Sequence, residues 1–198
     1  MAENEQIIVT AENAPEENIA PKGKRNFKGK NDRKERAPRK EASDLDKKVV
    51  CVRRVTKVVK GGRTLRFSAL VVVGDKKGKV GLGIGKSKDV TSAIDKATTI
   101  ARRNMKLIPI IDGTIPHETV GKYSATNILL LPAPEGTGVI AGGSARSVIE
   151  LAGIRNIVTK KHGSSNKINV VKATMEGLLS LKTKEEIARR RGKSVEEI

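Results

Sequence analysis

The stretch VVCVRRVTKVVKGGRTLRFSALVVVGDKKGKVGLGIGKSK, residues 49–88, decides the fold of this chain. It holds two apolar, β-branched runs, 49–59 and 64–74, on either side of the tip Lys60–Arg63 (KGGR). Glycine takes positive φ without steric cost, so paired glycines between two strand-like runs predict a tight hairpin. A third strand follows the turn 75–78 and ends in the alternating glycines of GLGIG. Alternate glycines in a strand predict a close backbone approach or a bulge.

The hairpin carries many cations and no residue set suited to catalysis. Around its tip lie Arg53, Arg54, Lys57, Lys60, Arg63 and Arg66. A stiff hairpin with bare backbone at its tip and Lys and Arg beside it is suited to contact phosphates. We therefore predict that this surface binds nucleic acid.

A helix is predicted over residues 89–105, because apolar residues recur there with the 3.6-residue period. Ser87 or Asp89 can cap its start. Arg102 and Arg103 lie in its last turn, where the helix dipole favours cations. Three strands and one helix predict a small α+β unit, in which the helix covers the sheet.

A second unit follows the link at residues 108–113. Strand patterns recur at 114–120 and 126–131, with Gly121 between them, and the loop 132–143 follows. The remaining pattern predicts a helix over 144–151, a strand over 154–161, a helix over 167–181 capped by Asn166, and a short helix from a Thr183–Glu186 capping box to Gly192. Each unit is small, so we expect two thin cores that can share an interface.

The charge of the chain is unevenly distributed. The net charge is +18, and residues 49–108 hold 15 basic and 3 acidic residues, a surplus of +12. The largest surplus therefore lies in a part of the chain that is predicted to fold. This favours a shaped basic surface over charge that only keeps the protein soluble.

Composition narrows the kind of nucleic acid. Aromatic residues are limited to Phe27, Phe67 and Tyr123, whereas proteins that read single strands usually stack bases on aromatic rings. The composition therefore favours a folded RNA that is bound through its backbone and shape. DNA is a less favoured partner, because no recognition-helix pattern or zinc-ligand set occurs. The single cysteine, Cys51, provides no disulfide framework. No apolar run reaches the roughly 20 residues of a membrane span, so we expect a soluble, cytoplasmic protein.

Residues 1–44 are predicted to be a disordered tail. They begin acidic and become basic from Lys22 to Lys40, and they contain too few apolar residues to build a core. The basic half either becomes ordered on RNA or remains a solubilising tail, and the sequence leaves both readings open.

Motifs that suggest cofactors or catalysis are incomplete. Gly136–Gly142 (GTGVIAG) matches the dinucleotide pattern, but that fingerprint needs an acidic residue about 20 positions on, and residues 155–161 contain none. His117 and His162 have no metal-ligand spacing, and Ser144 fits a helix N-cap better than a nucleophile. We expect no enzyme, no cofactor and no metal site. The glycine run is better explained by close backbone contact with protein or RNA.

The segment 160–166 (KKHGSSN) is a better candidate for binding. It places two cations, small hydroxyl groups and the start of a helix together, and this combination suits a phosphate. A capped surface turn without a ligand fits the same residues equally well.

Several segments together resemble the bacterial small-subunit ribosomal protein S5 family. They are 58–63 (VVKGGR), 67–75 (FSALVVVGD), 101–105 (ARRNM), 135–138 (EGTG), 141–143 (AGG), 163–166 (GSSN) and 191–198 (RGKSVEEI). They occur in the family's order over about 48–198, so the resemblance is specific. The first 45 or so residues have no counterpart.

The resemblance implies a fold of two small domains. Residues 45–110 are expected to be similar to the double-stranded-RNA-binding fold, without its binding mode being assumed. Residues 111–183 are expected to form an S5-type α/β domain with a left-handed crossover, and 184–198 a helical extension. With the tail at 1–44, the chain is predicted to be α+β.

The resemblance also implies a function. The family is a structural constituent of the small subunit, binds rRNA near the head–body junction, contributes to translational accuracy and lines the region where mRNA enters. It neighbours ribosomal proteins S4 and S8. The hairpin 56–63 is expected to approach the neck and the spectinomycin pocket, and the segment around Gly138 and Arg146 to face S4. No role is carried onto the hairpin 119–125.

The predicted contacts fall into two sets. The RNA-binding residues are Arg53, Arg54, Lys57, Lys60, Gly61, Gly62, Arg63, Lys86, Lys88, Arg102, Arg103, Lys160, Lys161, Ser164, Ser165 and Asn166. The protein-contact residues are Gly136, Gly138 and Arg146. We expect neither a membrane partner nor a homo-oligomer. The alternatives are an RNA-modifying enzyme, for which no acid–base set or nucleotide loop is present, and a free regulator that binds double-stranded RNA.

Overall fold

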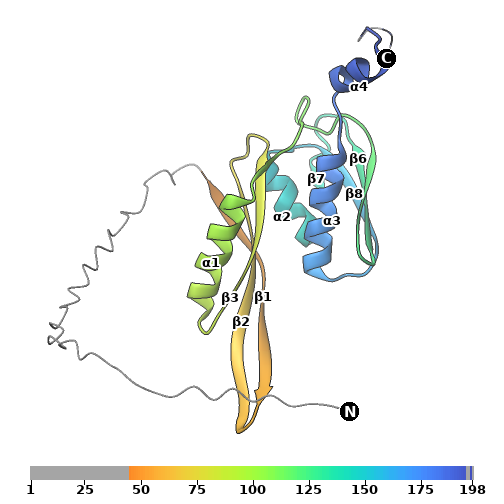
Figure 1. Cartoon of the computed structure of the whole chain (residues 1–198). Coiled ribbons are helices and arrows are strands. Elements are labelled where there is room, and N and C mark those ends of the chain that lie inside the picture. The colour runs from red at the N-terminus through yellow and green to blue at the C-terminus, as the bar shows by residue number, and fades with distance from the viewer. Residues whose placement is uncertain (1–44, 195–196, 198) are drawn as a thin grey trace, which may run out of the picture. The chain divides into compact units, whose positions relative to one another are not determined.

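The computed structural model describes residues 45–194 and residue 197, and these contain two sheets and four α-helices. The predicted tail 1–44 lies outside the described residues. The first part of the chain forms β1 (Asp46–Val59), β2 (Gly62–Gly74), β3 (Lys79–Ser87), α1 (Val90–Arg103) and β4 (Lys106–Leu107). The second part forms β5 (Thr119–Tyr123), β6 (Thr126–Pro132), β7 (Val139–Ile140), α2 (Gly143–Ala152), β8 (Ile157–Gly163), α3 (Lys167–Ser180) and α4 (Lys184–Arg191). Figure 1 shows the order of these elements.

The first sheet is antiparallel, in the order β1-β2-β3-β4, and both of its faces are covered along part of its length. Successive side chains of a strand point to opposite faces. In β2, Ala69, Val71 and Val73 pack with the alanines of α1. The intervening Leu70 and Val72 belong to the core that includes α2 and α3. We call these two faces the α1 face and the α2 face. The continuous apolar run of β2 follows from burial on both sides.

Helix α1 lies directly against the glycines of β3. A Cβ atom on Gly81, Gly83 or Gly85 would lie 2.1–2.2 Å from the carbonyl oxygen of Ala101, Ala97 or Ala93 respectively. The two-residue repeat of the strand therefore matches the four-residue repeat of the helix. This confirms the close backbone approach that the alternating glycines predict.

The second sheet has the order β5-β6-β8-β7, and only β7 and β8 run parallel among its pairs in the described part of the chain. Helix α2 joins those two strands and so forms a crossover, whose hand stays a prediction. Helix α3 covers β5 and β6, and its Ala173 carbonyl lies 2.0 Å from where a Cβ on Gly121 would be. Ile128, Leu130 and Ile157 point to this helical side and are buried.

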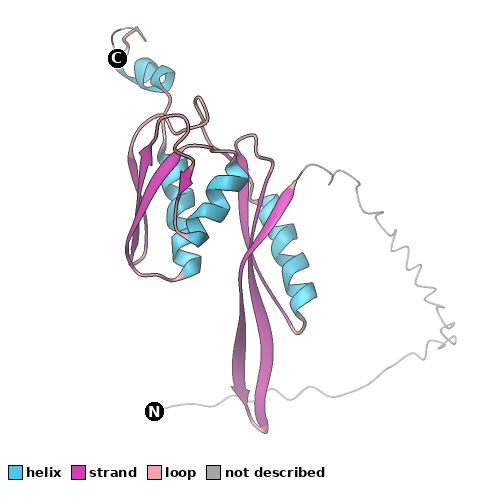
Figure 2. Ribbon diagram, turned by 180° about the vertical axis from the view of Figure 1, so that it is seen from behind, coloured by secondary structure: helices cyan, strands magenta, loops and turns pink. Residues whose placement is uncertain are grey.

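The β2–β3 turn caps the C-terminal end of α2. The backbone N–H groups of Lys76 and Gly78 donate to the last carbonyls of α2, on Leu151 and Ala152, at 3.1 and 2.9 Å. The terminal carbonyls of a helix have no partner within the helix. Both halves of the chain also contribute to one apolar core. They are therefore joined through backbone as well as side chains, and Figure 2 shows α2 between the two sheets.

Several local predictions are confirmed. The Asn166 side chain accepts from Ile168 N at the start of α3, Thr183 Oγ1 accepts from Glu186 N at 3.3 Å, and Gly192 ends α4 with φ +65°. The α+β class is also confirmed. Asp89 occupies the N-cap position of α1, but its side chain makes no capping hydrogen bond.

Other boundaries are wrong. The strand predicted at 114–120 begins at Thr119 and continues through Gly121, and the turn falls after Tyr123. Gly121 is needed for the contact with α3 and not for a turn. Ser144 lies inside α2, because Gly142 takes the N-cap position. The strand predicted from residue 154 begins at Ile157, and the two-residue strands β4 and β7 are too short to leave a pattern.

Candidate nucleic-acid interface

The hairpin of β1 and β2 extends beyond α1 and α3, as both ribbon views show (Figures 1 and 2). Val59 pairs with Gly62, so the tip is the two-residue turn Lys60-Gly61. Gly61 and Gly62 have φ of +91° and +146°, and no atom of the described residues lies within 4 Å of a Cβ built on either. The tip is therefore open backbone, as the sequence predicts, and is accessible to a large partner.

Strand register divides the hairpin cations between the two faces. Residues paired across strands lie on the same face. Arg53 pairs with Ser68, and Ser68 pairs with Lys86, so both cations share the α2 face. Arg54 pairs with Phe67 of the α1 face. By the same alternation the α2 face carries Arg53, Lys57, Arg66 and Lys86, and the α1 face carries Arg54 and Arg63.

The α2 face brings together two segments that are far apart in the sequence. The Arg53 guanidinium donates from Nη2 to Asn166 Oδ1 at 3.0 Å. The neighbouring Lys161 Nζ donates to Ser165 Oγ at 2.5 Å. The hairpin and the segment 160–166 are thus parts of one surface. We call it the basic face, and it comprises Arg53, Lys57, Arg66, Lys86, Lys161, Ser165 and Asn166.

Lys160 and Lys161 do not act together, although they are adjacent. Lys161 pairs with Ile128, which is buried on the helical side, whereas Lys160 pairs with Leu129 on the other side. β8 continues to Gly163, so both lysines lie inside a strand and point to opposite faces. Placing both cations at one phosphate was therefore wrong, and only Lys161 joins the basic face. Ser164 uses its oxygens within the turn, where its carbonyl accepts from Thr126 Oγ1.

A small cavity of about 180 Å³ lies at the edge of the basic face. Lys161, Ser165 and Lys167 line one side, and Gly142, Gly143 and Ser144 at the start of α2 line the other. Free N–H groups at a helix start favour an anion. The N-cap glycine of α2 has no side chain to occupy them. The arrangement can accept a phosphate oxygen, and sequence reasoning missed Lys167 and the start of α2 because the fold alone brings them near Lys161.

The remaining predicted cations lie elsewhere. Lys88 precedes α1 and is exposed near the hairpin end of the sheet. Arg102 and Arg103 lie at the opposite end, because Ala93 faces Gly85 while Ala101 faces Gly81. The predicted RNA-binding residues therefore do not form a single cluster.

The predicted loop Glu135–Arg146 contains β7 and the first turn of α2, and it is held by specific contacts. Gly138 has φ +72° and donates its N–H to Asn156 Oδ1 at 3.1 Å, while Gly136 has φ +89° and open space around it. These glycines precede β7, whereas a dinucleotide fingerprint lies between a strand and its helix. The geometry therefore agrees with the rejection of that motif.

Arg146 takes part in a small charge network. Its Nε lies 3.2 Å from Glu150 Oε1, its Nη2 donates to Val139 O at 3.2 Å, and Glu150 Oε2 lies 2.6 Å from Lys48 Nζ. The network links β1 to α2. Its exposed side chains leave the guanidinium accessible to a partner while its direction is fixed.

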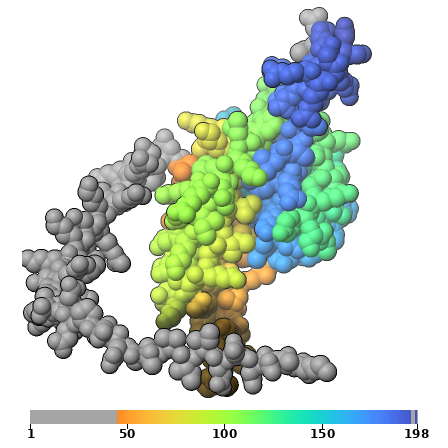
Figure 3. Space-filling model, viewed as in Figure 1, coloured from red at the N-terminus to blue at the C-terminus, as the bar shows by residue number. Residues whose placement is uncertain are grey.

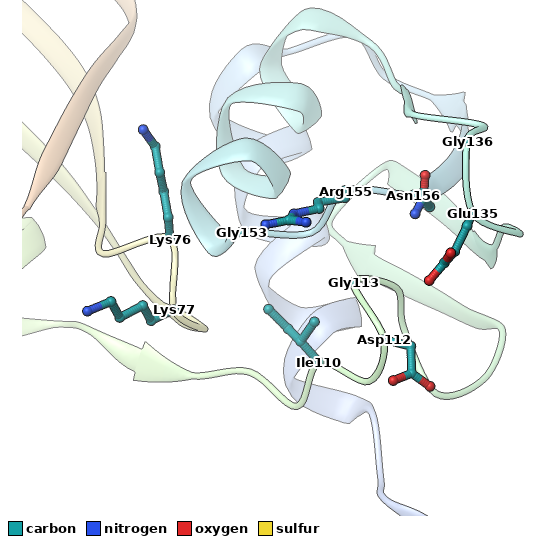
Figure 4. Close-up of a pocket in the computed structure, with 10 residues that line it drawn as sticks. All are labelled: Lys76, Lys77, Ile110, Asp112, Gly113, Glu135, Gly136, Gly153, Arg155 and Asn156. Atoms are coloured by element: carbon teal, nitrogen blue, oxygen red, sulfur yellow. The ribbon is translucent and has the colours of Figure 1, made fainter.

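A larger pocket of about 610 Å³ lies where the β2–β3 turn meets the second part of the chain (Figure 4). Cations and the carboxylates of Asp112 and Glu135 line it together. Its lining therefore has charges of both signs, which does not favour an RNA strand. The hydrogen bond that Lys76 Nζ donates to the Asp46 carboxylate, together with the charge of that carboxylate, raises the pKa of Lys76 above its usual value. Within residues 45–194 no three acidic, His or Cys side chains gather as a metal site requires.

Comparison with known proteins identifies the family of the chain. The family model described as "Ribosomal protein S5, N-terminal domain" matches residues 45–109, and "Ribosomal protein S5, C-terminal domain" matches 121–191. Proteins named "Small ribosomal subunit protein uS5" from Ralstonia nicotianae and Polaromonas sp. are 55% and 56% identical to it over 154 residues. That alignment covers 78% of this chain and 90% of each relative, and one from Cupriavidus pinatubonensis is 54% identical over the same length. The chain belongs to the ribosomal protein S5 family.

Membership of the S5 family confirms the resemblance drawn from the sequence motifs. S5 proteins are ribosomal proteins and not enzymes, which confirms the prediction that this chain has no catalytic site. The first matched S5 region contains the first sheet, and the second begins within β5 of the second sheet and extends through α4. No helix in the described part of the chain is long and apolar enough to cross a membrane.

Proposed function

We propose that the protein is a structural component of the small ribosomal subunit that binds rRNA through its basic face and hairpin. The observation that carries this proposal is the hydrogen bond between Arg53 and Asn166, which unites two predicted phosphate-binding segments. Among the described residues none of Arg53, Lys57, Arg66, Lys86 and Lys161 takes part in an ion pair. Cations that no carboxylate of the described residues neutralises are available to neutralise phosphates.

The finer function follows from the resemblance. The hairpin tip lies against the neck near the spectinomycin pocket, at the head–body junction, and the protein supports accurate decoding where mRNA enters. The loop Glu135–Arg146 contacts S4, and S8 is a second protein neighbour. Support comes from the open glycines of both the tip and the loop, since a Cβ built on Gly61, Gly62, Gly136 or Gly138 would meet no atom of the described chain within 4 Å.

Neighbouring lysines provide a test with a built-in control. Lys161→Gln removes a cation from the basic face, whereas Lys160→Gln removes the same charge from the opposite face of β8. We expect Lys161→Gln to weaken binding to small-subunit rRNA and Lys160→Gln to leave it nearly unchanged. Equal losses in both variants would contradict the assignment of the basic face.

Sedimentation distinguishes a ribosomal component from a free regulator. A full-length tagged chain in cell extract should travel with small subunits through a density gradient and stay with them at moderate salt. A chain found only in the light fractions would favour the free double-stranded-RNA-binding regulator.

A further inference from the structure

A groove that is separate from the basic face lies away from the hairpin, between the end of α1 and α3. Its volume is about 580 Å³, within the range of roughly 300–1,000 Å³ that holds small ligands. Arg103 and Lys106 line it from the end of α1 and from β4, and Tyr123 and Lys172 line it from β5 and α3. Figure 3 shows the surfaces of α1 and α3 next to each other on this side of the molecule.

The groove is lined by cations that form no ion pair within the described residues. Arg103, Lys106 and Lys172 take part in no ion pair within the described residues, and Glu176 is the single carboxylate lining the groove there. The rim thus has three positive charges and one negative charge. This balance attracts an anionic polymer.

Lys172 is held in place by the only tyrosine of the chain. Its Nζ donates to Tyr123 Oη at 2.7 Å and lies 4.5 Å from the centre of the Tyr123 ring. Both contacts fix an otherwise flexible side chain, which lowers the entropy lost when it binds a phosphate. Two of the three ammonium hydrogens remain free to donate.

The floor of the groove is apolar. Leu82, Met175 and Leu179 line it, and Met175 is 4% exposed. Thioether and aliphatic side chains provide a surface on which a sugar or base can pack. Cations around an apolar floor therefore match one nucleotide unit better than they match a bare anion.

The polar side of α3 connects this groove to the basic face. Asn169, Lys172 and Glu176 follow each other at spacings of three or four residues, so they lie along one side of α3, and Ser165 lies just before the N-cap residue Asn166 at the start of this helix. Ser165 belongs to the basic face, and Lys172 belongs to the groove. This continuity favours a further part of the same RNA over an acidic protein segment.

We propose that the α1–α3 groove is a second rRNA-binding site, in which Arg103, Lys106 and Lys172 hold the phosphates of an unpaired stretch and one nucleotide packs on the apolar floor. The inference rests on the proposed rRNA-binding function. Tyr123 is a positioning residue that acts through Lys172. The site joins both halves of the protein, because its cations come from both.

The test measures binding of the full-length protein to small-subunit rRNA over a range of salt concentrations. Each of Arg103→Gln, Lys106→Gln and Lys172→Gln should reduce the slope of log affinity against log salt by about 0.7–0.9. The control is Lys122→Gln, which removes a charge next to Tyr123. Lys122 pairs with the exposed Asn127 on the other face of β5 and should leave the slope unchanged.

Tyr123→Phe tests the positioning role. It keeps the ring but removes the hydroxyl that accepts from Lys172, so it should cause part of the Lys172→Gln loss. The double variant Tyr123→Phe/Lys172→Gln should bind no more weakly than Lys172→Gln alone. Additive losses would contradict action through Lys172.

The outcomes separate this inference from the proposed function. If the wild-type protein binds rRNA with a steep salt slope while the groove variants behave like Lys122→Gln, the groove is not an RNA site. If the wild type shows no salt-dependent binding, the proposed function itself fails. Groove variants that bind rRNA normally but are lost from assembled subunits would indicate an acidic protein segment and overturn the inference. Arg103 is exposed, so Arg103→Gln remains informative even if Lys172→Gln lowers stability.

Discussion

The absence of a Cβ atom at Gly81, Gly83 and Gly85 allows α1 to lie directly on the first sheet. A Cβ at Gly83 would lie 2.1 Å from Ala97 O and 2.6 Å from Ala101 N, both backbone atoms that cannot turn aside. The three alanines of α1 and the three glycines of β3 therefore act together, because each pair allows the two backbones to come into contact. The short distance between the two backbones is the reason that neither element tolerates a larger residue there.

Gly83→Val should destabilise the protein by about 1–3 kcal/mol, because overpacking forces the helix away from the sheet. The measurement is the midpoint of urea unfolding. Gly143→Ala is the matched control, since a Cβ at Gly143 would have no atom of the described chain within 4 Å. Its midpoint should stay the same or rise slightly, because alanine is the better helix former. A Gly83→Val midpoint equal to the wild type would refute the packing argument.

In the β1–β2 hairpin, a substitution can strain the backbone of the tip without lowering the stability of the core. Its tip has positive φ, and a Cβ there would meet no atom of residues 45–194, so a change at the tip strains a few backbone angles without disturbing the core. A side chain added at the tip therefore leaves the described core unchanged and is available to an external partner.

Gly61→Val should leave the protein folded but impair assembly, decoding accuracy and the response to spectinomycin in cells that rely on the variant. Valine at φ +91° distorts the turn and adds bulk where rRNA is proposed to lie. Thr64→Val, a β-branched replacement in the same hairpin, controls for general effects of an apolar change. Normal growth, accuracy and spectinomycin response with Gly61→Val would rule out a functional tip.

The loop Glu135–Arg146 gives a second prediction at this scale. Arg146→Glu should loosen the proposed contact with S4 and alter misreading without abolishing rRNA binding. Glu150→Gln breaks the same ion pair but keeps the guanidinium, so it should preserve the contact. Exposed pairs contribute about 0–1 kcal/mol, so both variants should remain folded. Pull-down of S4 with assembled subunits measures the effect, and equal retention of S4 by both variants would contradict the role of Arg146.

Elements with strong local signals could be predicted from the sequence. The β1–β2 hairpin, α1, α3 and the caps at Asn166 and Thr183 each leave a periodic or positional pattern. β5 was misplaced because Gly121 has the composition of a turn but serves a helix contact. The opposed directions of Lys160 and Lys161 could not be known before the end of β8 was fixed. The groove of Lys172 left no local signal, since its lining comes from four separate segments.

At the scale of the whole molecule, the distribution of cations predicts how affinity depends on salt. The predicted contacts are Arg53, Arg54, Lys57, Lys60, Arg63, Lys86, Lys88, Arg102 and Arg103. If roughly six of them neutralise phosphates, affinity for small-subunit rRNA should fall about a thousandfold between roughly 50 and 200 mM salt. Each neutral replacement at a contact should reduce the slope by about one unit or less. A flat titration of the full-length protein would show that phosphate contacts do not dominate.

The apolar core that β2 shares with the second part of the chain has a consequence for synthesis of the protein. Leu70 and Val72 on the α2 face of β2 belong to one core with α2 and with residues of the second part as far as Leu181. At about 5–20 residues per second, the roughly 90 residues between β3 and Leu181 take about 5–20 s to translate. During that interval a nascent chain exposes one apolar side of a finished sheet. We expect this side to be a transient chaperone target, so that a ribosomal protein matures only when the last third of its own chain has left the ribosome.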